Sequence, residues 1–528
     1  MLALFTSIFV SGQSKAKVSV LMASASQKFL GNDYWGALDA YRSAQKLDEG
    51  NAKINYKIAD CHYHLKHYKY ARQYFEEAEK LDPNIDKNLH LSLGQTYHRL
   101  EELTLAIEHF KKYRKVAPER DITLYDVNGL IKQCEYAGEM MKNPLDVKID
   151  NLGRAINSRF DDYAPSLSSD GTIMMFTSRR AGMTHNAVDT KGDYKYFEDI
   201  FVAERDDMNS SWGQSERLDA LDTDGHDAVL SISPKATEIF IYKNNINSAG
   251  DIFKSSRESL EDEWSEPKKL PKPINTTYFE SSISITADGS TMYFISERPK
   301  NGLGRGDIYV TRKTGDDSWS KPTNLGSVIN TPKDEKFVFV HPNGSTIFFA
   351  SAGHLTMGSY DIFKSELMDG QWTTPVNLGY PINTVNEEST FSMTADNKKL
   401  LISAEYENTM GERDIYEIDL SNIDILDVLN IDSELLEAKA NVLVYGTLKV
   451  EKYDKNIRNA DITFLNAKTE EVIYKITSDK EGAYEVSLPF GETYLMRINS
   501  EKYGLKEEKI KLKERDGVGS ELKLDVLF

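Results

Sequence analysis

Alternating apolar and polar residues dominate the middle of this chain and recur as one repeated unit. Each unit ends in an Asp-Ile-aromatic triplet, and the steps between successive triplets are 52, 56, 54 and 53 residues. The triplets begin at Asp199, Asp251, Asp307, Asp361 and Asp414. Short strands repeated at so long a period are typical of propeller blades. The pattern therefore predicts an all-β propeller of five repeats over residues 142–420.

The two ends of this region complement each other. A Trp follows the triplet in four units, at Trp212, Trp264, Trp319 and Trp372, whereas the fifth unit has no such segment after Asp414. The first unit is instead preceded by an alternating stretch, Leu145–Ile149. We therefore expect this N-terminal strand to complete the last blade and close the ring, which removes free sheet edges. The alternative is a sixth blade, for which the insertion between Arg179 and Glu198 offers room.

Helical spacing replaces strand alternation in residues 16–141. The alanines Ala37, Ala71 and Ala106 are 34 and 35 residues apart. An aromatic residue follows four positions after each, at Tyr41, Phe75 and Phe110. This is the spacing of tetratricopeptide repeats, in which a small residue lets paired helices lie close together. We expect an all-α solenoid of three such repeats, closed by a helix over Leu124–Met141.

The C-terminal part is separated from the propeller by an acidic, Leu-rich linker, residues 421–440. Residues 441–528 again alternate, with turns at Asp479–Gly482 and Pro489–Gly491. This pattern predicts a small antiparallel β-sandwich. The segment Asn459–Ile462 and the pattern Ser478-Asp479-x-x-Gly482-x-Tyr484 resemble the carboxypeptidase regulatory-like domain, and the resemblance implies a structural module without an active site.

The net charge argues against one class of partner, and the N-terminal residues indicate export. The net charge is −19, which argues against nucleic acid, since phosphate binding needs clustered Lys and Arg. Residues 1–13 carry a short apolar run followed by small residues and are predicted to be a signal peptide, incomplete because no basic segment precedes the run. The alternative is a buried N-terminal element. Only two cysteines occur, Cys61 and Cys134, and both are interpreted as buried small apolar residues.

Few residues suggest catalysis or metal binding. His62, His64 and His67 are the densest group of histidines. On a helix His62 and His64, two positions apart, face different sides and cannot chelate as a His-x-x-x-His pair does, so we expect the group on the surface or in the groove of the helical repeats. The segment Asp222–Asp227 resembles a calcium loop but lacks the bidentate glutamate, so a structural loop is favoured. Neither a Gly-x-Ser-x-Gly elbow nor a phosphate-binding loop occurs. We therefore predict no enzyme, no cofactor and no metal.

Acidic side chains recur in every unit. The Asp of each Asp-Ile triplet is interpreted as a turn cap that accepts backbone N–H bonds. A second acidic position follows each linker, and rotational symmetry should gather these residues on one face. That candidate partner-binding ring consists of Asp162, Asp227, Glu280, Glu335 and Glu388. The predicted face is electronegative and would favour a basic partner or cations.

The repeats resemble the PD40 form of WD40-like propellers, on the linkers that begin at Asn151, Asn324 and Asn377 and on the Asp-Ile triplets. The order of modules resembles a Bacteroidetes envelope family of OmpA type, which includes the PorE component of the type IX secretion system. The resemblance implies a periplasmic, non-enzymatic scaffold with outer-membrane secretion components as protein partners. The printed chain ends at Phe528 without the family's OmpA-like domain, so peptidoglycan binding is not carried over. The alternative function is a propeller that senses a peptide or glycan.

Overall fold

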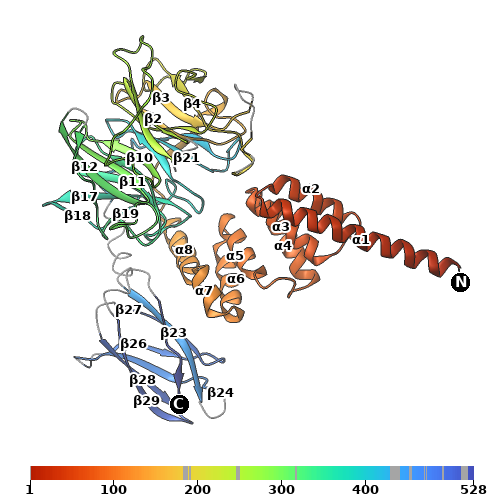
Figure 1. Ribbon diagram of the computed structural model, residues 1–528. Coiled ribbons are helices and arrows are strands. Elements are labelled where there is room, and N and C mark those ends of the chain that lie inside the picture. Colours follow the sequence, from red (N-terminus) through yellow and green to blue (C-terminus); the bar gives the residue numbers. More distant parts are fainter. Residues whose placement is uncertain are drawn as a thin grey trace. The chain divides into compact units, whose positions relative to one another are not determined.

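The computed structural model describes residues 2–181, 188–189, 192–244, 250–315, 318–428, 441–450, 455–468, 470, 472–489, 493–512 and 521–528. The chain forms two compact units, Met1–Val428 and Leu429–Phe528 (Figure 1). The first unit carries the helices and five of the sheets, and the second carries two further sheets. The predicted order of an α-helical solenoid, a propeller and a small sandwich is thus the order observed.

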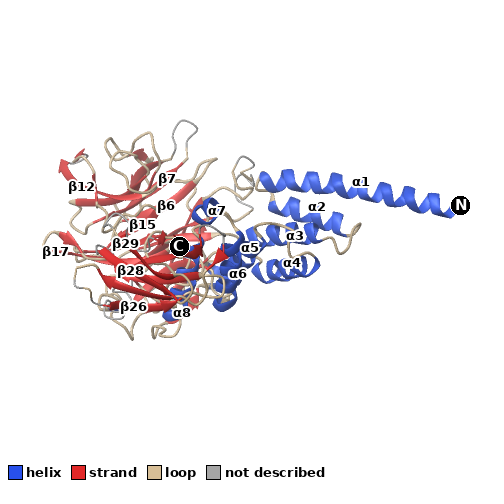
Figure 2. Ribbon diagram, turned by 90° about the horizontal axis from the view of Figure 1, so that it is seen from below, coloured by secondary structure: helices blue, strands red, loops and turns tan. Residues whose placement is uncertain are grey.

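The helices stack in antiparallel pairs, and α1, α2, α3 and α4 lie side by side (Figure 2). They are α1 (Leu2–Leu30), α2 (Tyr34–Gln45), α3 (Ala52–His64), α4 (Tyr68–Leu81), α5 (Leu89–Arg99), α6 (Leu103–Val116), α7 (Glu119–Leu124) and α8 (Val127–Met140). Ala37, Ala71 and Ala106 are fully buried between the helices, as their spacing predicts. The predicted closing helix is α8, which packs on α6. Among the described residues, no helix has both the length and the apolar character needed to cross a bilayer.

One close approach explains a small residue in the third repeat. A Cβ added at Gly94 of α5 would lie 2.6 Å from the ring of Phe110 on α6. Since Phe110 is fully buried, its ring cannot move aside without opening the core. The glycine therefore allows the two helices to pack at this distance.

The propeller is built from antiparallel sheets, and the innermost strands of blades 1 to 4 start at the predicted acidic positions. Blade 1 consists of β2 (Asp162–Leu167), β3 (Ile173–Ser178), β4 (Asp199–Glu204) and β5 (Glu216–Arg217). Blade 2 consists of β6 (Asp227–Ile232), β7 (Glu238–Lys243), β8 (Asp251–Ser256) and β9 (Lys268–Lys269). Blade 3 consists of β10 (Glu280–Ile285), β11 (Thr291–Ser296), β12 (Asp307–Gly315), β13 (Ser318–Trp319) and β14 (Thr323–Asn324).

The remaining two blades complete the ring. Blade 4 consists of β15 (Glu335–Val340), β16 (Thr346–Ser351), β17 (Asp361–Met368), β18 (Gln371–Trp372) and β19 (Val376–Asn377). Blade 5 consists of β20 (Thr390–Met393), β21 (Lys399–Ala404), β22 (Asp414–Asp419) and β1 (Lys148–Asn151). The residues that the structure describes form five blades, and the insertion after Arg179, as far as it is described, contributes one isolated bridge, Val188 to Tyr196.

The ring closes as the sequence predicts. β1 pairs antiparallel with β22, with Lys148 opposite Asp419 and Asn151 opposite Tyr416. The innermost strand of blade 1, β2, contacts β20 and β21 of blade 5. The last blade therefore takes its outer strand from the start of the propeller sequence.

A repeated asparagine bonds its linker to the blade before it, and a repeated aspartate caps a turn. Asn330, in the linker between blades 3 and 4, donates to Ile308 O at 3.0 Å and accepts from Ile308 N at 2.8 Å. Asn157, Asn275 and Asn383 make the same pair of bonds to Ile415, Ile252 and Ile362. Asp307 accepts from the backbone N–H groups of Leu303 and Gly304 at 2.7 and 3.1 Å, and Asp361 and Asp414 cap their turns in the same way, which confirms the predicted turn cap in these three copies. Asp251 instead pairs with Lys269 at 2.7 Å.

The second unit is a sandwich of two sheets around one core. One sheet contains β23 (Asn441–Val450), β24 (Lys455–Asn456), β27 (Ala483–Pro489), β30 (Glu521–Lys523) and β31 (Val526–Leu527). The other contains β25 (Asp461–Asn466), β26 (Val472–Thr477), β28 (Thr493–Ser500) and β29 (Gly504–Lys511). Val444, Phe464 and Met496 meet in the shared core.

The predicted linker divides at the boundary between the two units. Ile425 is buried in the core of blades 4 and 5, so residues 421–428 belong to the propeller unit. Residues 429–440 lie outside the described residues.

Candidate functional site

The five acidic residues predicted to form an exposed ring are instead buried. Their exposed fractions are 0% for Asp162, Asp227, Glu280 and Glu388 and 1% for Glu335. Each carboxylate accepts from the backbone N–H and the hydroxyl of a Ser or Thr four residues earlier, as Glu280 does from Thr276 at 2.8 and 2.6 Å. They close the linker turns and present no face to a partner, which corrects the prediction.

The five blades differ in whether a cation pairs with the buried carboxylate. In blades 1 to 3 a cation of the same blade pairs with the acid: Arg180 with Asp162 at 2.8 Å, Lys243 with Asp227 at 2.9 Å and Arg298 with Glu280 at 3.4 Å. In blades 4 and 5 the positions that correspond to Arg180 hold Gly353 and Tyr406.

Burial therefore dominates the electrostatics of the acids in blades 4 and 5. Burial raises the pKa of Glu335 to about 8. Burial, and then the charge of Asp361, raise the pKa of Glu388 well above its usual value. Both acids lie on the blades that the helical repeats contact.

The raised pKa of Glu335 predicts a pH-dependent stability. The folded state holds this proton more tightly than the unfolded chain does, so the stabilisation is complete below about pH 4 and is lost as the pH rises toward 8. Glu335→Gln should reduce the fall in melting temperature between pH 6 and pH 9 by several degrees. Thermal unfolding at both pH values measures this.

Glu280→Gln provides the matched control for that experiment. It removes the carboxylate that Arg298 contacts, so we expect it to destabilise the protein by about 1–3 kcal/mol at both pH values. An unchanged pH dependence in Glu335→Gln would show that Glu335 does not hold a proton in the folded state.

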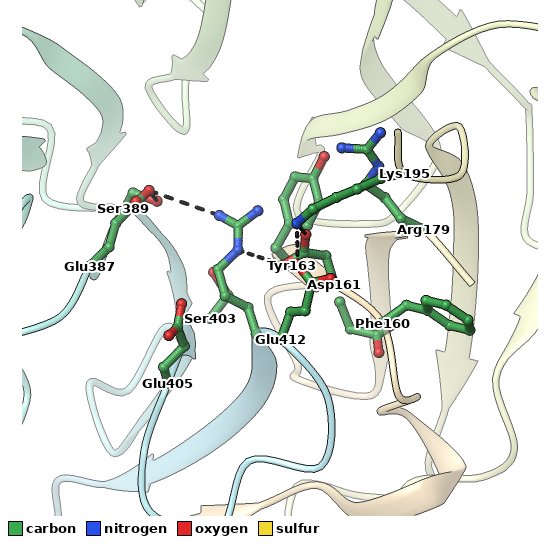
Figure 3. A network of polar contacts seen from close by, with 12 residues as sticks. Phe160, Asp161, Tyr163, Arg179, Lys195, Glu387, Ser389, Ser403, Glu405 and Glu412 are labelled. Carbon is green, nitrogen blue, oxygen red and sulfur yellow. Dashed lines mark hydrogen bonds and ion pairs between the residues drawn. The ribbon is translucent and has the colours of Figure 1, made fainter. Parts of the chain in front are cut away.

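A second set of polar and charged residues lines one mouth of the propeller channel, near the starts of β2, β4, β20 and β22. This mouth cluster consists of Asp161, Tyr163, Lys195, Glu387 and Glu412, which Figure 3 labels, and of Arg413, which contacts Asp161 and Glu387. Lys195 Nζ lies 2.7 Å from Asp161 Oδ2 and also pairs with Glu412. Arg413 Nε donates to Asp161 Oδ1 at 3.0 Å. Blades 1 and 5 are thus joined by an alternating chain of charges.

Cations in and beside the cluster lower the pKa of two of its carboxylates, Asp161 and Glu387, although burial alone would raise both. Burial alone would raise the pKa of Asp161, but Arg413 and Lys195 hold it well below its usual range. Burial is likewise outweighed at Glu387, whose pKa Lys336 and Arg413 lower to about 2. Lys336 Nζ lies 2.6 Å from Glu387 Oε1. Each carboxylate named here pairs with a cation, an arrangement that fixes the shape of the mouth.

The network continues from blade 1 toward blade 2. Tyr163 donates to Glu198, whose other oxygen lies 2.8 Å from Nδ1 of His226. Burial alone would lower the pKa of His226, but the hydrogen bond and charge of Glu198 raise it. Arg179 contacts both carboxylate oxygens of Asp193 at 2.6 and 2.9 Å. The mouth therefore offers aromatic and charged groups in fixed positions.

The helical repeats meet the propeller at a polar interface, which we call the seam. His98 Nε2 donates to Met357 O at 2.9 Å, and Arg99 donates to Val385 O and to Ser359 Oγ. From α8, Gln133 donates to Thr356 Oγ1 at 2.6 Å. His98 is buried. The segments contacted lead into β17 and into blade 5, where Arg99 also supplies a positive charge near Glu388.

Two ion pairs flank the seam. Lys66, between α3 and α4, pairs with Glu405 after β21. Lys333, before β15, lies 2.6 Å from Asp126. Repeats and propeller are therefore held at several points.

A cavity of ≈ 230 Å³ lies at the opposite end of the channel, beside the turns that follow the innermost strands. Its walls carry serine and aromatic side chains, among them Ser284, Phe339 and Phe391. Ser284 Oγ accepts from Val340 N at 2.9 Å, so the serines also join neighbouring blades.

The remaining sequence predictions have mixed outcomes. Cys61 and Cys134 are buried and free, as expected. Asp222 accepts from Ile200 N at 2.9 Å in the place of a linker asparagine, which supports a structural loop. Of the three histidines predicted on the surface or in the groove, His64 is exposed and His67 is half-buried, whereas His62 is buried because its ring packs beside Tyr70 and Tyr74.

At two of the three doubled acidic positions, the predicted ring residue is not the one that reaches the mouth cluster. Asp161, next to Asp162, and Glu387, next to Glu388, are the residues that reach the mouth cluster. The two adjacent acids at these positions could have indicated this outcome, because neighbouring side chains in extended backbone point to opposite sides. No comparable pattern marked His98 and Arg99, because their partners lie far away in the sequence.

Fold and site together define a helical-repeat and propeller protein, built from two folds that commonly serve as protein-binding platforms. Residues 52–85 match the model of the tetratricopeptide repeat. Human protein O-mannosyl-transferase TMTC3 is 26% identical over 132 residues, which are 25% of this chain and 13% of that protein. The chain thus spans only a small part of this relative's length.

Two solved structures are similar in fold to one part each. The first tetratricopeptide domain of Spaghetti (RPAP3), bound to an HSP90 peptide, is 18% identical and covers 24% of this chain and 94% of its own, with a TM-score of 0.22. TolB from Acinetobacter baumannii is 12% identical and covers 50% of this chain and 56% of its own, with a TM-score of 0.31.

Proposed function

We propose that this protein is a non-enzymatic adaptor whose helical repeats and propeller bind protein partners as one rigid surface. The observation that carries the proposal is the seam. His98, Arg99 and Gln133 bond to buried parts of the propeller, including backbone carbonyls, so the repeats are fixed to the blades rather than tethered by a linker. An adaptor needs such a fixed geometry to hold two partners in register.

Exposed aromatic side chains on the repeats support this role. Trp35, at the start of α2, is 62% exposed, and Tyr70, at the start of α4, is 56% exposed. Aromatic residues of this kind are enriched in the central contacts of protein interfaces. Tetratricopeptide repeats generally bind peptide segments along their surface, and the RPAP3 domain is bound to a peptide in its structure.

The cellular setting forms part of the same proposal. The apolar N-terminal segment and the order of modules favour an exported scaffold of the periplasm, associated with the outer membrane through its partners. The process served would be protein secretion of the type IX kind or gliding. The sandwich would act as a spacer of the carboxypeptidase regulatory-like type.

Site-specific crosslinking in intact cells tests the adaptor proposal. A photo-crosslinking amino acid at Trp35 or Tyr70 should capture outer-membrane secretion or gliding proteins. Tyr474 in the sandwich is 43% exposed and serves as the matched control position, from which these partners should not be captured. Equal capture from all three positions, or capture of nothing but the chain itself, would contradict the proposal.

The channel cavity favours a second candidate, a propeller that binds a peptide or glycan. A cavity of ≈ 230 Å³ with serine hydroxyls and aromatic rings can hold one side chain or one sugar ring. Calorimetric titration with short peptides and oligosaccharides checks this. Phe339→Ala should then weaken binding at least tenfold, whereas Tyr474→Ala should leave it unchanged.

A further inference from the structure

Three potential metal ligands converge inside the helical repeats. Glu79 comes from α4, His90 from α5 and His109 from α6, and one ligand atom from each lies within 4.8 Å of the others. His90 Nδ1 is 3.2 Å from His109 Nδ1 and 3.6 Å from Glu79 Oε1. His109 is buried, and the other two side chains are half-buried.

These distances match those between ligands of a tetrahedral metal ion. Metal–ligand bonds of about 2.0–2.1 Å at tetrahedral angles place neighbouring ligand atoms roughly 3.3 Å apart. The two imidazole nitrogens face each other and the carboxylate oxygen approaches the same point. Two imidazoles and one carboxylate form a ligand set that zinc takes in proteins, with one position left for water.

The charges around the cluster fit a cation. Lys112, whose charge acts on both imidazoles, is ion-paired with Glu108 at 2.8 Å. Tyr97, whose ring lies tilted beside that of His109 with centroids 5.2 Å apart, donates to Glu76 at 2.9 Å. Lys112 and Tyr97 thus have other acidic partners, and the carboxylate of Glu79 stays beside the imidazole of His90.

We propose that Glu79, His90 and His109 bind a Zn²⁺ ion that links the second and third helical repeats. The ion would join α4 of one repeat to α5 and α6 of the next, so it would fix the angle between them. Since a ligand that binds only the folded state stabilises that state by mass action, zinc should also raise the stability of the repeats.

A second histidine pair in the same repeats provides the contrast. His62 Nδ1 and His67 Nδ1 are 3.4 Å apart, nearly the separation in the first pair. The adjacent charged group, however, is Arg42, whose Nη2 lies 3.3 Å from His62 Nε2. A guanidinium repels a metal ion, so this pair should not bind zinc.

The test uses the metal-free full chain and zinc chloride in isothermal titration calorimetry. We expect one saturable site per chain. His90→Gln and His109→Gln should each weaken it by more than about 100-fold, because losing an outer-shell partner alone costs 10–100-fold. The matched control, His67→Gln, should bind within about twofold of the parent. Cobalt(II) should give the visible absorption of a tetrahedral site in the parent and in His67→Gln only.

Two outcomes would overturn the proposal. One is the lack of a saturable zinc site in the parent chain. The other is binding that persists unchanged in His90→Gln and Glu79→Gln, which would mean that zinc occupies a different place. Both of these side chains are half-buried, so their variants remain informative if His109→Gln fails to fold.

Discussion

Arg99→Ala should loosen the helical repeats from the propeller and split the thermal unfolding transition of the first unit, Met1–Val428, into two. Arg99 ends α5 and donates to Val385 O and Ser359 Oγ of the propeller. Without its guanidinium the carbonyl of buried Val385 loses a donor, and Glu388 loses a nearby positive charge. Charge-assisted bonds of this kind suggest a loss of about 2–4 kcal/mol. Differential scanning calorimetry measures both the loss and the splitting.

Arg72→Ala is the control for this experiment. Arg72 pairs with Glu102 within the helices, and both side chains are about one third exposed, at 32% and 33%. A solvated pair contributes less than about 1 kcal/mol, so a single transition should remain. If Arg99→Ala also unfolded in one unshifted transition, the seam would not couple the two folds.

Gly358→Ala should destabilise the propeller by at least about 2–3 kcal/mol. A Cβ at this position would lie 2.0 Å from Asn386 O and 2.7 Å from Thr384 O. These are backbone atoms of the segment that enters blade 5, so neither can rotate away. Gly358 and Gly304 each lie three residues before an Asp-Ile triplet. A Cβ added at Gly304 would lie 1.8 Å from Lys333 O. Urea unfolding of the purified variant measures the effect.

The same substitution in a helix should act in the opposite direction. At Gly138 of α8 the nearest atom to an added Cβ is Leu103 Cδ1 at 3.6 Å, an ordinary contact. Gly138→Ala should therefore stabilise the repeats by up to about 1 kcal/mol through helix propensity. Similar behaviour of the two variants would mean that close backbone approach does not limit position 358.

The repeated architecture could be predicted because its determinants are local. A linker asparagine, a capped turn and an Asp-Ile triplet each act over a few residues, and their recurrence predicted both the blades and the closing strand. Ala71 and Phe75 likewise indicated helix packing through their spacing alone. Such features can be recognised in a single sequence because each repeat carries the same residues at the same spacing.

The candidate sites could not be predicted in the same way. Lys195 and Arg413 meet at Asp161 from opposite ends of the propeller sequence. Glu79, His90 and His109 come from three helices, at spacings that match no familiar ligand motif. Asp161 and Asp162 are adjacent and chemically identical, yet only Asp161 belongs to the mouth cluster. Residue type alone therefore does not show which of the two side chains reaches the mouth.

The closing strand also sets the order in which a newly made chain can finish folding. β1 leaves the ribosome before every other strand of the propeller, yet its partner β22 is the last to appear. At about 5–20 residues per second, the early strand waits through the synthesis of four blades. During that interval β1 offers unpaired backbone groups, the feature that promotes edge-to-edge aggregation. In the finished ring β22 pairs with β1 over Lys148–Asn151, so an unpaired β1 distinguishes an incomplete copy from a complete one.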